Sequence, residues 1–183
     1  MRRTVLPLAL ALLLGGCGDA TTGRPVRIPE AAPPQRAELG WREAYPGRSG
    51  ERLVFVVDEL AVTANGWTAR VAVSNLTSVA FDSGRPVDFR YGLMLFATGD
   101  LGELEEAART VGLPSVRQAS TIEPPPPAVL RPGATWRATL SAAGSLPAGA
   151  YARVVFGPLS VEGDPPEGME PIVVWITDHA QRL

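Results

Sequence analysis

The side chains that could carry out chemistry in this 183-residue chain are few in type. All 17 basic residues are arginines, and the chain holds one histidine, His179, and one cysteine, Cys17. Chemistry that needs a lysine, such as Schiff-base formation or a phosphate-binding loop lysine, is therefore excluded. One histidine and one cysteine also cannot complete a closed zinc site, which takes four nitrogen or sulfur ligands.

A hydrolase is one alternative that these residues leave open. His179 could act as a general base for a serine, but the chain has no Gly-x-Ser-x-Gly motif, and Ser145 falls in an expected hairpin turn. Asp58, Glu59 and Asp88 could supply a carboxylate pair for glycoside hydrolysis, although nothing in the sequence sets their separation. We expect His179 to be a surface or strand-end histidine, and we expect no catalytic residue.

Four acidic residues are close together in one loop with two prolines and two glycines: Glu162, Asp164, Glu167 and Glu170. Carboxylate oxygens are the ligands that Ca²⁺ prefers, so this loop is a weak calcium candidate, but its spacing is not that of an EF-hand. We expect a solvated acidic loop, with no bound metal and no cofactor.

The four tryptophans are candidates for binding. An exposed tryptophan can stack on a sugar or anchor a protein partner. Trp136 alternates with polar residues on one strand face, so we expect it in the core. Trp67, which follows a hairpin turn, and Trp41 are the possible ligand contacts. Asn75-Leu76-Thr77 matches a glycosylation acceptor, which we interpret as a chance match.

The N-terminus is typical of a secretory signal. Arg2 and Arg3 precede an apolar run from Val5 to Leu14, and a run of about ten residues is too short to span a bilayer, which takes about 20. The arginine pair leaves a twin-arginine export route open beside the general secretory route.

The apolar run ends in Leu14-Gly15-Gly16-Cys17, which resembles the lipobox of bacterial lipoproteins. The resemblance implies that a signal peptidase recognises Leu14, Gly15 and Gly16 and cleaves before Cys17. It also implies a diacylglyceryl group on the thiol and an acyl chain, such as palmitate, on the new amine. Each buried methylene contributes about 0.8 kcal/mol, so two or three acyl chains hold a protein firmly on a membrane.

Cleavage before Cys17 would leave 15 arginines against 19 acidic residues. This acidic balance does not favour nucleic acid as a partner. We divide the chain into a signal peptide (1–16), a proline-rich tether (17–50) with a reach on the order of 100 Å, and a folded domain (51–183).

Alternation of apolar and polar residues predicts strands through most of the domain. Asn65-Gly66 predicts a hairpin turn, because both residues tolerate positive φ. The last strand, 172–177, is apolar on both sides, so we expect both of its faces to be covered. The expected strands are 53–63, 67–74, 89–95, 135–142, 151–156 and 172–177, with two shorter ones around 116–122 and 128–130.

One helix is expected at about 100–111, with Asp100 and Glu103 at capping-box spacing and Gly112 ending it. The entry at 130–136 and the segment 146–151, which is similar to a tyrosine corner, resemble immunoglobulin-like sandwiches. The sequence thus predicts a mainly β fold, an immunoglobulin-like antiparallel β-sandwich with one short helix.

These observations predict a lipid-anchored, non-catalytic interaction or binding module on the extracytoplasmic face of a cell membrane. Its partner would be an envelope protein or a glycan. The alternative is a carbohydrate- or small-ligand-binding lipoprotein that uses Trp67 or Trp41. The sequence leaves open whether the inner or the outer membrane holds the anchor.

Overall fold

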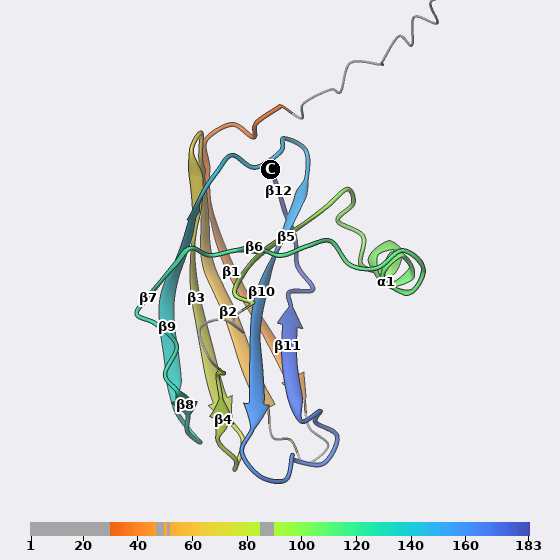
Figure 1. Ribbon diagram of the computed structural model, residues 1–183. Coiled ribbons are helices and arrows are strands. Elements are labelled where there is room, and N and C mark those ends of the chain that lie inside the picture. The colour runs from red at the N-terminus through yellow and green to blue at the C-terminus, as the bar shows by residue number, and fades with distance from the viewer. Residues whose placement is uncertain (1–29, 47–49, 51, 85–89) are drawn as a thin grey trace, which may run out of the picture.

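The computed structural model describes residues 30–46, 50, 52–84 and 90–183, which form two antiparallel β-sheets packed face to face (Figure 1). The predicted mainly β fold with one short helix is confirmed. The layers form a β-sandwich, and its immunoglobulin-like character stays a prediction. The segment that resembles a lipobox, with Cys17, the expected tether as far as residue 29, and Asp88 lie outside the described residues.

The first sheet has five strands in the order β1-β2-β3-β9-β7. On β9, buried Trp136, Ala138 and Leu140 alternate with exposed polar side chains, as the period of two predicted. The bounds of these strands are β1 Gln35–Pro46, β2 Arg52–Thr63, β3 Gly66–Leu76, β9 Thr135–Ala143 and β7 Thr121–Glu123.

The second sheet is built around β10, Tyr151–Val161. One side of β10 pairs with β5 and β4, which lead on to β6 and β8, and its other side pairs with β11 and β12. The bounds are β5 Gly92–Phe96, β4 Phe81–Asp82, β6 Arg117–Gln118, β8 Val129–Leu130, β11 Ile172–Ile176 and β12 Gln181–Arg182.

Aromatic rings from both sheets meet in the core. Phe55 of β2 lies 5.1 Å from Phe156 of β10 and is stacked at 5.5 Å on Trp175 of β11, measured between ring centroids. Trp136 of β9 meets Tyr91 edge-on at 5.3 Å. Such pairs add to the free energy gained from burying the rings, and they stabilise the packing of one sheet on the other.

The expected start of the folded domain at residue 51 is wrong, because β1 is a full strand of the first sheet. It pairs with β2 from Gln35↔Val62 to Pro46↔Arg52. A bulge between Glu38 and Trp41, with Gly40 at φ 58°, interrupts the alternation of β1. The tether prediction therefore fails for residues 35–46.

The hairpin between β2 and β3 is confirmed, but its turn lies one residue earlier than expected. Ala64 and Asn65 form the turn, and Gly66 already pairs with Thr63. Gly66 does not have a positive φ. A Cβ at this position would lie 2.6 Å from the carbonyl oxygen of Ala142 on β9, so Gly66 is required by the close approach of that strand.

Helix α1, Leu101–Thr110, confirms the predicted helix. Asp100 caps it, since its Oδ1 accepts the backbone N–H of Glu103 at 2.9 Å. Leu104 packs in a small apolar cluster with side chains of β5 and β10, so α1 covers part of the outer face of the second sheet (Figure 1). No helix in the described part of the chain is long and apolar enough to cross a bilayer.

The expectation that both faces of β11 are covered is wrong. Val173 is buried in the core, whereas Ile172 is 59% exposed and Val174 is 47% exposed on the other face. Helix α1 reaches only the end of β11 at Ile176, which packs against the small cluster.

We predict that Gly66→Ala lowers the free energy of unfolding by about 1–3 kcal/mol, because the added methyl group overpacks against the β9 backbone. Asn65→Ala, in the exposed turn next to it, should change this free energy by less than about 0.5 kcal/mol. Urea denaturation of both variants measures the difference. Equal effects of the two substitutions would contradict the close-approach explanation for Gly66.

Candidate functional site

Glu43 places a buried carboxylate at the edge of the first sheet. After the bulge in β1, its side chain points into the sandwich and is 7% exposed. Its Oε2 accepts the indole N–H of Trp175 at 2.9 Å and the backbone N–H of Asp178 at 2.8 Å. Its Oε1 accepts the backbone N–H of His179 at 3.0 Å and lies 2.7 Å from Nδ1 of the same residue. Both carboxylate oxygens are therefore fully used.

These donors keep Glu43 ionised. Burial alone raises the pKa of its carboxyl group, but the hydrogen bonds from the His179 ring, the two backbone N–H groups and the Trp175 indole outweigh it. The resulting pKa lies below the usual glutamate value. The ionised carboxylate therefore holds the end of β11, at Trp175, and the backbone of Asp178 and His179 over the whole neutral pH range.

Arg153 on β10 is the complementary buried cation, only 1% exposed. Its Nη1 donates to the carbonyl oxygens of Thr177, at 2.7 Å, and of Asp178, and its Nη2 donates to Gly99 O at 3.0 Å. Burial lowers the pKa of the guanidinium, and the nearby charges of Asp178 and Glu43 oppose this. Arginine remains charged at physiological pH even so.

Glu43 and Arg153 act on the same short stretch of backbone. Glu43 accepts N–H groups of Asp178 and His179, while Arg153 donates to carbonyl oxygens of Thr177 and Asp178. Thr177 adds a bond from Val154 N–H to its Oγ1. We call Glu43, Arg153 and residues 177–179 the clamp. It joins an edge of the first sheet to the central strand of the second.

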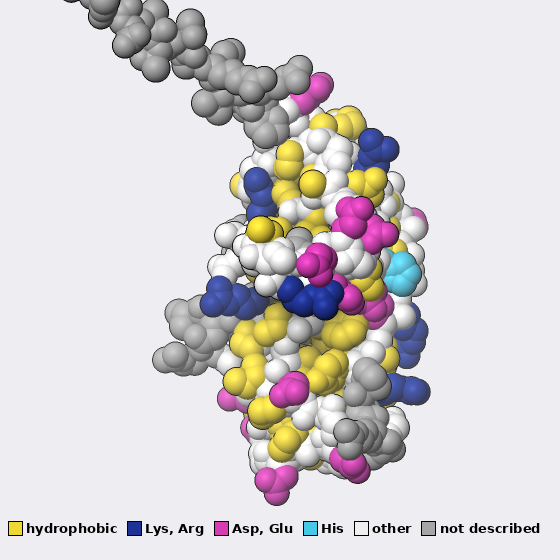
Figure 2. All heavy atoms as spheres, turned by 90° about the vertical axis from the view of Figure 1, so that its right-hand side faces the viewer, with side chains coloured by type: hydrophobic (Ala, Val, Ile, Leu, Met, Phe, Trp, Pro, Cys, Tyr) yellow, Lys and Arg dark blue, Asp and Glu magenta, His cyan; other side chains and the backbone are white. Residues whose placement is uncertain are grey.

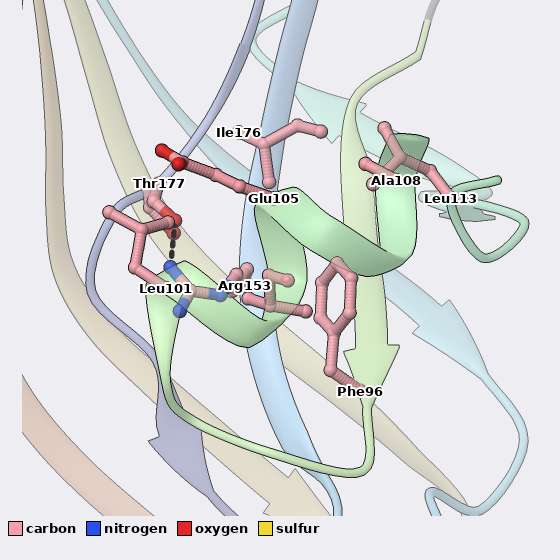
Figure 3. Close-up of a pocket in the computed structure, with 9 residues that line it drawn as sticks. Phe96, Leu101, Glu105, Ala108, Leu113, Arg153, Ile176 and Thr177 are labelled. Carbon is pink, nitrogen blue, oxygen red and sulfur yellow. Dashed lines mark hydrogen bonds between the residues drawn. The ribbon is translucent and has the colours of Figure 1, made fainter. Parts of the chain in front are cut away.

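A small apolar cavity of about 120 Å³ lies between α1 and the second sheet, next to the clamp (Figure 3). Arg153 lies below the start of α1, close to Leu101, with its guanidinium directed at Thr177 (Figure 3). The remaining wall is aliphatic and aromatic, and Glu105 stands at its rim. The lining residues are Phe96, Leu101, Leu104, Glu105, Ala108, Leu113, Arg153, Ile176 and Thr177.

An exposed hydrophobic surface continues from this cavity along β11. Figure 2 shows hydrophobic side chains gathered on the outer face of the second sheet. We call this surface the outer apolar patch. Ile176 lines the cavity, so the patch and the cavity form one continuous surface. The members of the patch are Ile172, Val174 and Ile176 of β11, with Leu101 (41% exposed) and Leu113 (49% exposed) beside them.

Two of the sequence-predicted binding residues have other roles. The prediction of Trp67 as a ligand contact is wrong, because this side chain faces the core and is 3% exposed. Trp41 is half-buried, and its ring stacks on that of His179 with centroids 5.6 Å apart. His179 lies just before the last strand, where it pairs with Glu43. The expected strand-end position of His179 is confirmed, and its ring neighbours are a carboxylate and an indole.

Of the carboxylates that could supply a pair for glycoside hydrolysis, Asp58 and Glu59 have different surroundings, and Asp88 lies outside the described residues. Asp58 is exposed at the bulge of β2, whereas Glu59 is covered by arginines: Arg36 lies 2.7 Å and Arg70 2.8 Å from its carboxylate oxygens. The hydrogen bond from Arg36 lowers the pKa of Glu59. This arrangement is an ion-pair network on the outer face of the first sheet.

The acidic loop, which the sequence offered only as a weak calcium candidate, holds no cluster of potential metal ligands among the described residues. Glu162, Asp164, Glu167 and Glu170 are all exposed. Asn75, the first residue of the glycosylation match, is fully buried and donates to Val79 O at 2.7 Å. It is a structural residue.

Sequence reasoning missed Glu43 and Arg153. Each is a charge inside an otherwise apolar pattern: Glu43 shares the inward face with Trp41 and Tyr45, and Arg153 stands within the apolar run 151–156. A charge at a core position of a strand is a signal for a buried polar network. The partners of that network are more than a hundred residues away from Glu43, so the pattern alone could not identify them.

Comparisons with protein-family models, with curated proteins and with solved structures find no match for this chain.

We predict that Glu43→Gln lowers the free energy of unfolding by about 2–3 kcal/mol at pH 7, as expected for losing hydrogen bonds to a buried charge. Because folding lowers the pKa of Glu43, its contribution is fully present above the unfolded-state value near 4.3 and is lost as pH falls through the folded value. The gap between wild type and variant should therefore shrink below about pH 4. Urea denaturation at several pH values measures it.

Glu38→Gln is the matched control, since this carboxylate is 71% exposed and lies 3.3 Å from Arg70. Its loss should cost under about 1 kcal/mol. A Glu43→Gln effect as small as that of the control, or one that grows on acidification, would contradict the role given to Glu43.

Proposed function

We propose that this chain is a lipid-anchored, non-catalytic protein of the cell envelope whose β-sandwich is an interaction module on the extracytoplasmic side of a membrane. The observation that carries the proposal is Leu14-Gly15-Gly16-Cys17, placed directly after an apolar run. Acyl chains on the sulfur and amine of Cys17 would hold the domain at the membrane surface.

The positions of the chain ends support this orientation. The described chain begins at Glu30, whose carbonyl oxygen accepts Ala148 N–H, and it ends at Leu183, which bonds to Gly149 and Ala150. Both contacts lie at the β9–β10 connection, at one end of the sandwich (Figure 1). The loop between β10 and β11 lies at the opposite end, so an anchor on Cys17 would leave that end pointing away from the membrane.

The length of chain between the anchor and the sandwich limits how far the domain can lie from the membrane. From Cys17 to Glu30, an extended chain reaches at most about 45 Å. This is less than half the reach expected when the tether was taken to run to residue 50. A domain on such a connection works near its own membrane surface, which favours a partner within the envelope.

The outer apolar patch is the surface that best fits an interaction role. Ile172 and Val174 leave aliphatic side chains in water next to a cavity, and a hydrophobic surface rimmed by polar residues marks interaction sites. We place the interaction function there, on the outer face of the second sheet.

We predict that Cys17→Ser abolishes acylation and releases the protein from membranes, or leaves it unprocessed. Membrane fractionation and mass spectrometry of the N-terminal peptide measure both effects. Thr22→Ser, which leaves the lipobox intact, is the control and should remain membrane-bound. An unmodified Cys17 in wild-type protein from its native host would contradict the anchor.

A further inference from the structure

Strand β11 differs from the other edge strands of the two sheets. In the described part of the chain, β11 pairs only with β10, so its other side presents free backbone groups. Natural edge strands avoid unwanted pairing by being very short or by carrying charges or proline. Among the other edge strands, β1, β6, β7 and β12 carry charged residues and β8 has two residues, whereas the five residues of β11 include neither charge nor proline.

The side chains of β11 extend this edge into a shaped surface. Ile172, Val174 and Ile176 follow each other on the outer face, and Ile176 forms part of the wall of the 120 Å³ cavity. A strand added beside β11 would place every second side chain next to this row. The rest of the cavity wall comes mainly from α1, β5 and β10, so the cavity lies on the β10 side of this row, and the free edge of β11 lies on its other side.

The chain segment that contains β11 carries acidic charges only, and Arg153 of β10 is buried against the end of the strand. Residues 154–181 contain no lysine or arginine, and they include Glu162, Asp164, Glu167, Glu170 and Asp178. The four acids of the loop are exposed at one end of the strand, and Glu105 stands at the cavity rim near the other end. A segment with basic residues at its ends would be attracted to both ends of β11.

We propose that β11 is a docking strand: it accepts an extended aliphatic segment of a partner protein, flanked by lysine or arginine, as an added β-strand. In this mode the backbone hydrogen bonds supply affinity, and the pockets beside alternate side chains supply specificity. The inference deepens the proposed function by naming the binding surface and the chemistry of the partner.

A second copy of this chain fits β11 poorly. Antiparallel pairing of two copies about Val174 would place Glu170 of one copy opposite Asp178 of the other at both ends of the shared strand. Like charges directly opposite each other destabilise a strand pair. An extended segment with basic ends meets no such repulsion, and it converts the same acids into attractive contacts.

The test measures binding of a fluorescent nine-residue peptide, alternating valine and threonine between two terminal arginines, to the full chain in non-ionic detergent. We expect saturable binding that weakens with added salt. A peptide with glutamate ends, and one with a central proline, should bind about tenfold more weakly or not at all.

Val174→Arg is the diagnostic variant, because it places a charge on an exposed position of the strand and should leave the fold intact. We expect it to weaken peptide binding at least about tenfold. Leu76→Arg, at an equally exposed leucine at the end of β3 (42%), is the matched control and should bind like wild type. Ile172→Lys provides a second variant if Val174→Arg lowers the melting temperature.

The proposal would be overturned if the peptide did not bind, or if Val174→Arg and Ile172→Lys left its affinity unchanged. A dimer of wild-type protein that Val174→Arg dissociates would also overturn it, in favour of a second copy. Cys17→Ser should leave peptide binding unchanged. Failure of the anchor and failure of the docking strand are therefore distinguishable.

Discussion

A buried carboxylate and a buried guanidinium, acting on the same three residues of backbone, hold the two sheets together at one edge. The segment 177–179 forms no strand, so its polar backbone groups need partners from elsewhere. Glu43 accepts hydrogen bonds from the N–H groups of this segment, and Arg153 donates hydrogen bonds to its carbonyl oxygens. The two charges therefore compensate each other through the peptide groups between them. Removing either charge would leave the other buried without compensation, which is costly.

The clamp also determines what the protein presents to its surroundings. By fixing the residues after Ile176, it holds β11 against β10 with the Trp175 ring on Phe55 and with Ile172 and Val174 facing outward. Arg153 also bonds Gly99, just before α1, so the helix and the cavity beneath it are positioned by the same side chain. The outer apolar patch thus depends on a polar interaction buried behind it.

The sequence was a good guide where one local rule decided the outcome. The period of two placed Trp136 in the core, and the cap at Asp100 marked the start of α1. It failed where distant residues decide. Glu43 breaks the apolar face of β1 and the bulge at Gly40 shifts it, so the strand resembled a linker. The exposure expected for Trp67 and the burial expected for both faces of β11 were wrong, because burial depends on which face the opposing sheet or α1 covers.

A double-mutant cycle on the clamp tests its central role most directly. Unfolding free energies of Glu43→Gln, Arg153→Met and the combined variant would be compared with wild type by urea denaturation. Either single change frees the shared segment, so the second should cost less, with a coupling energy of about 1 kcal/mol or more. Effects that add within about 0.5 kcal/mol would show two independent sites and contradict the account.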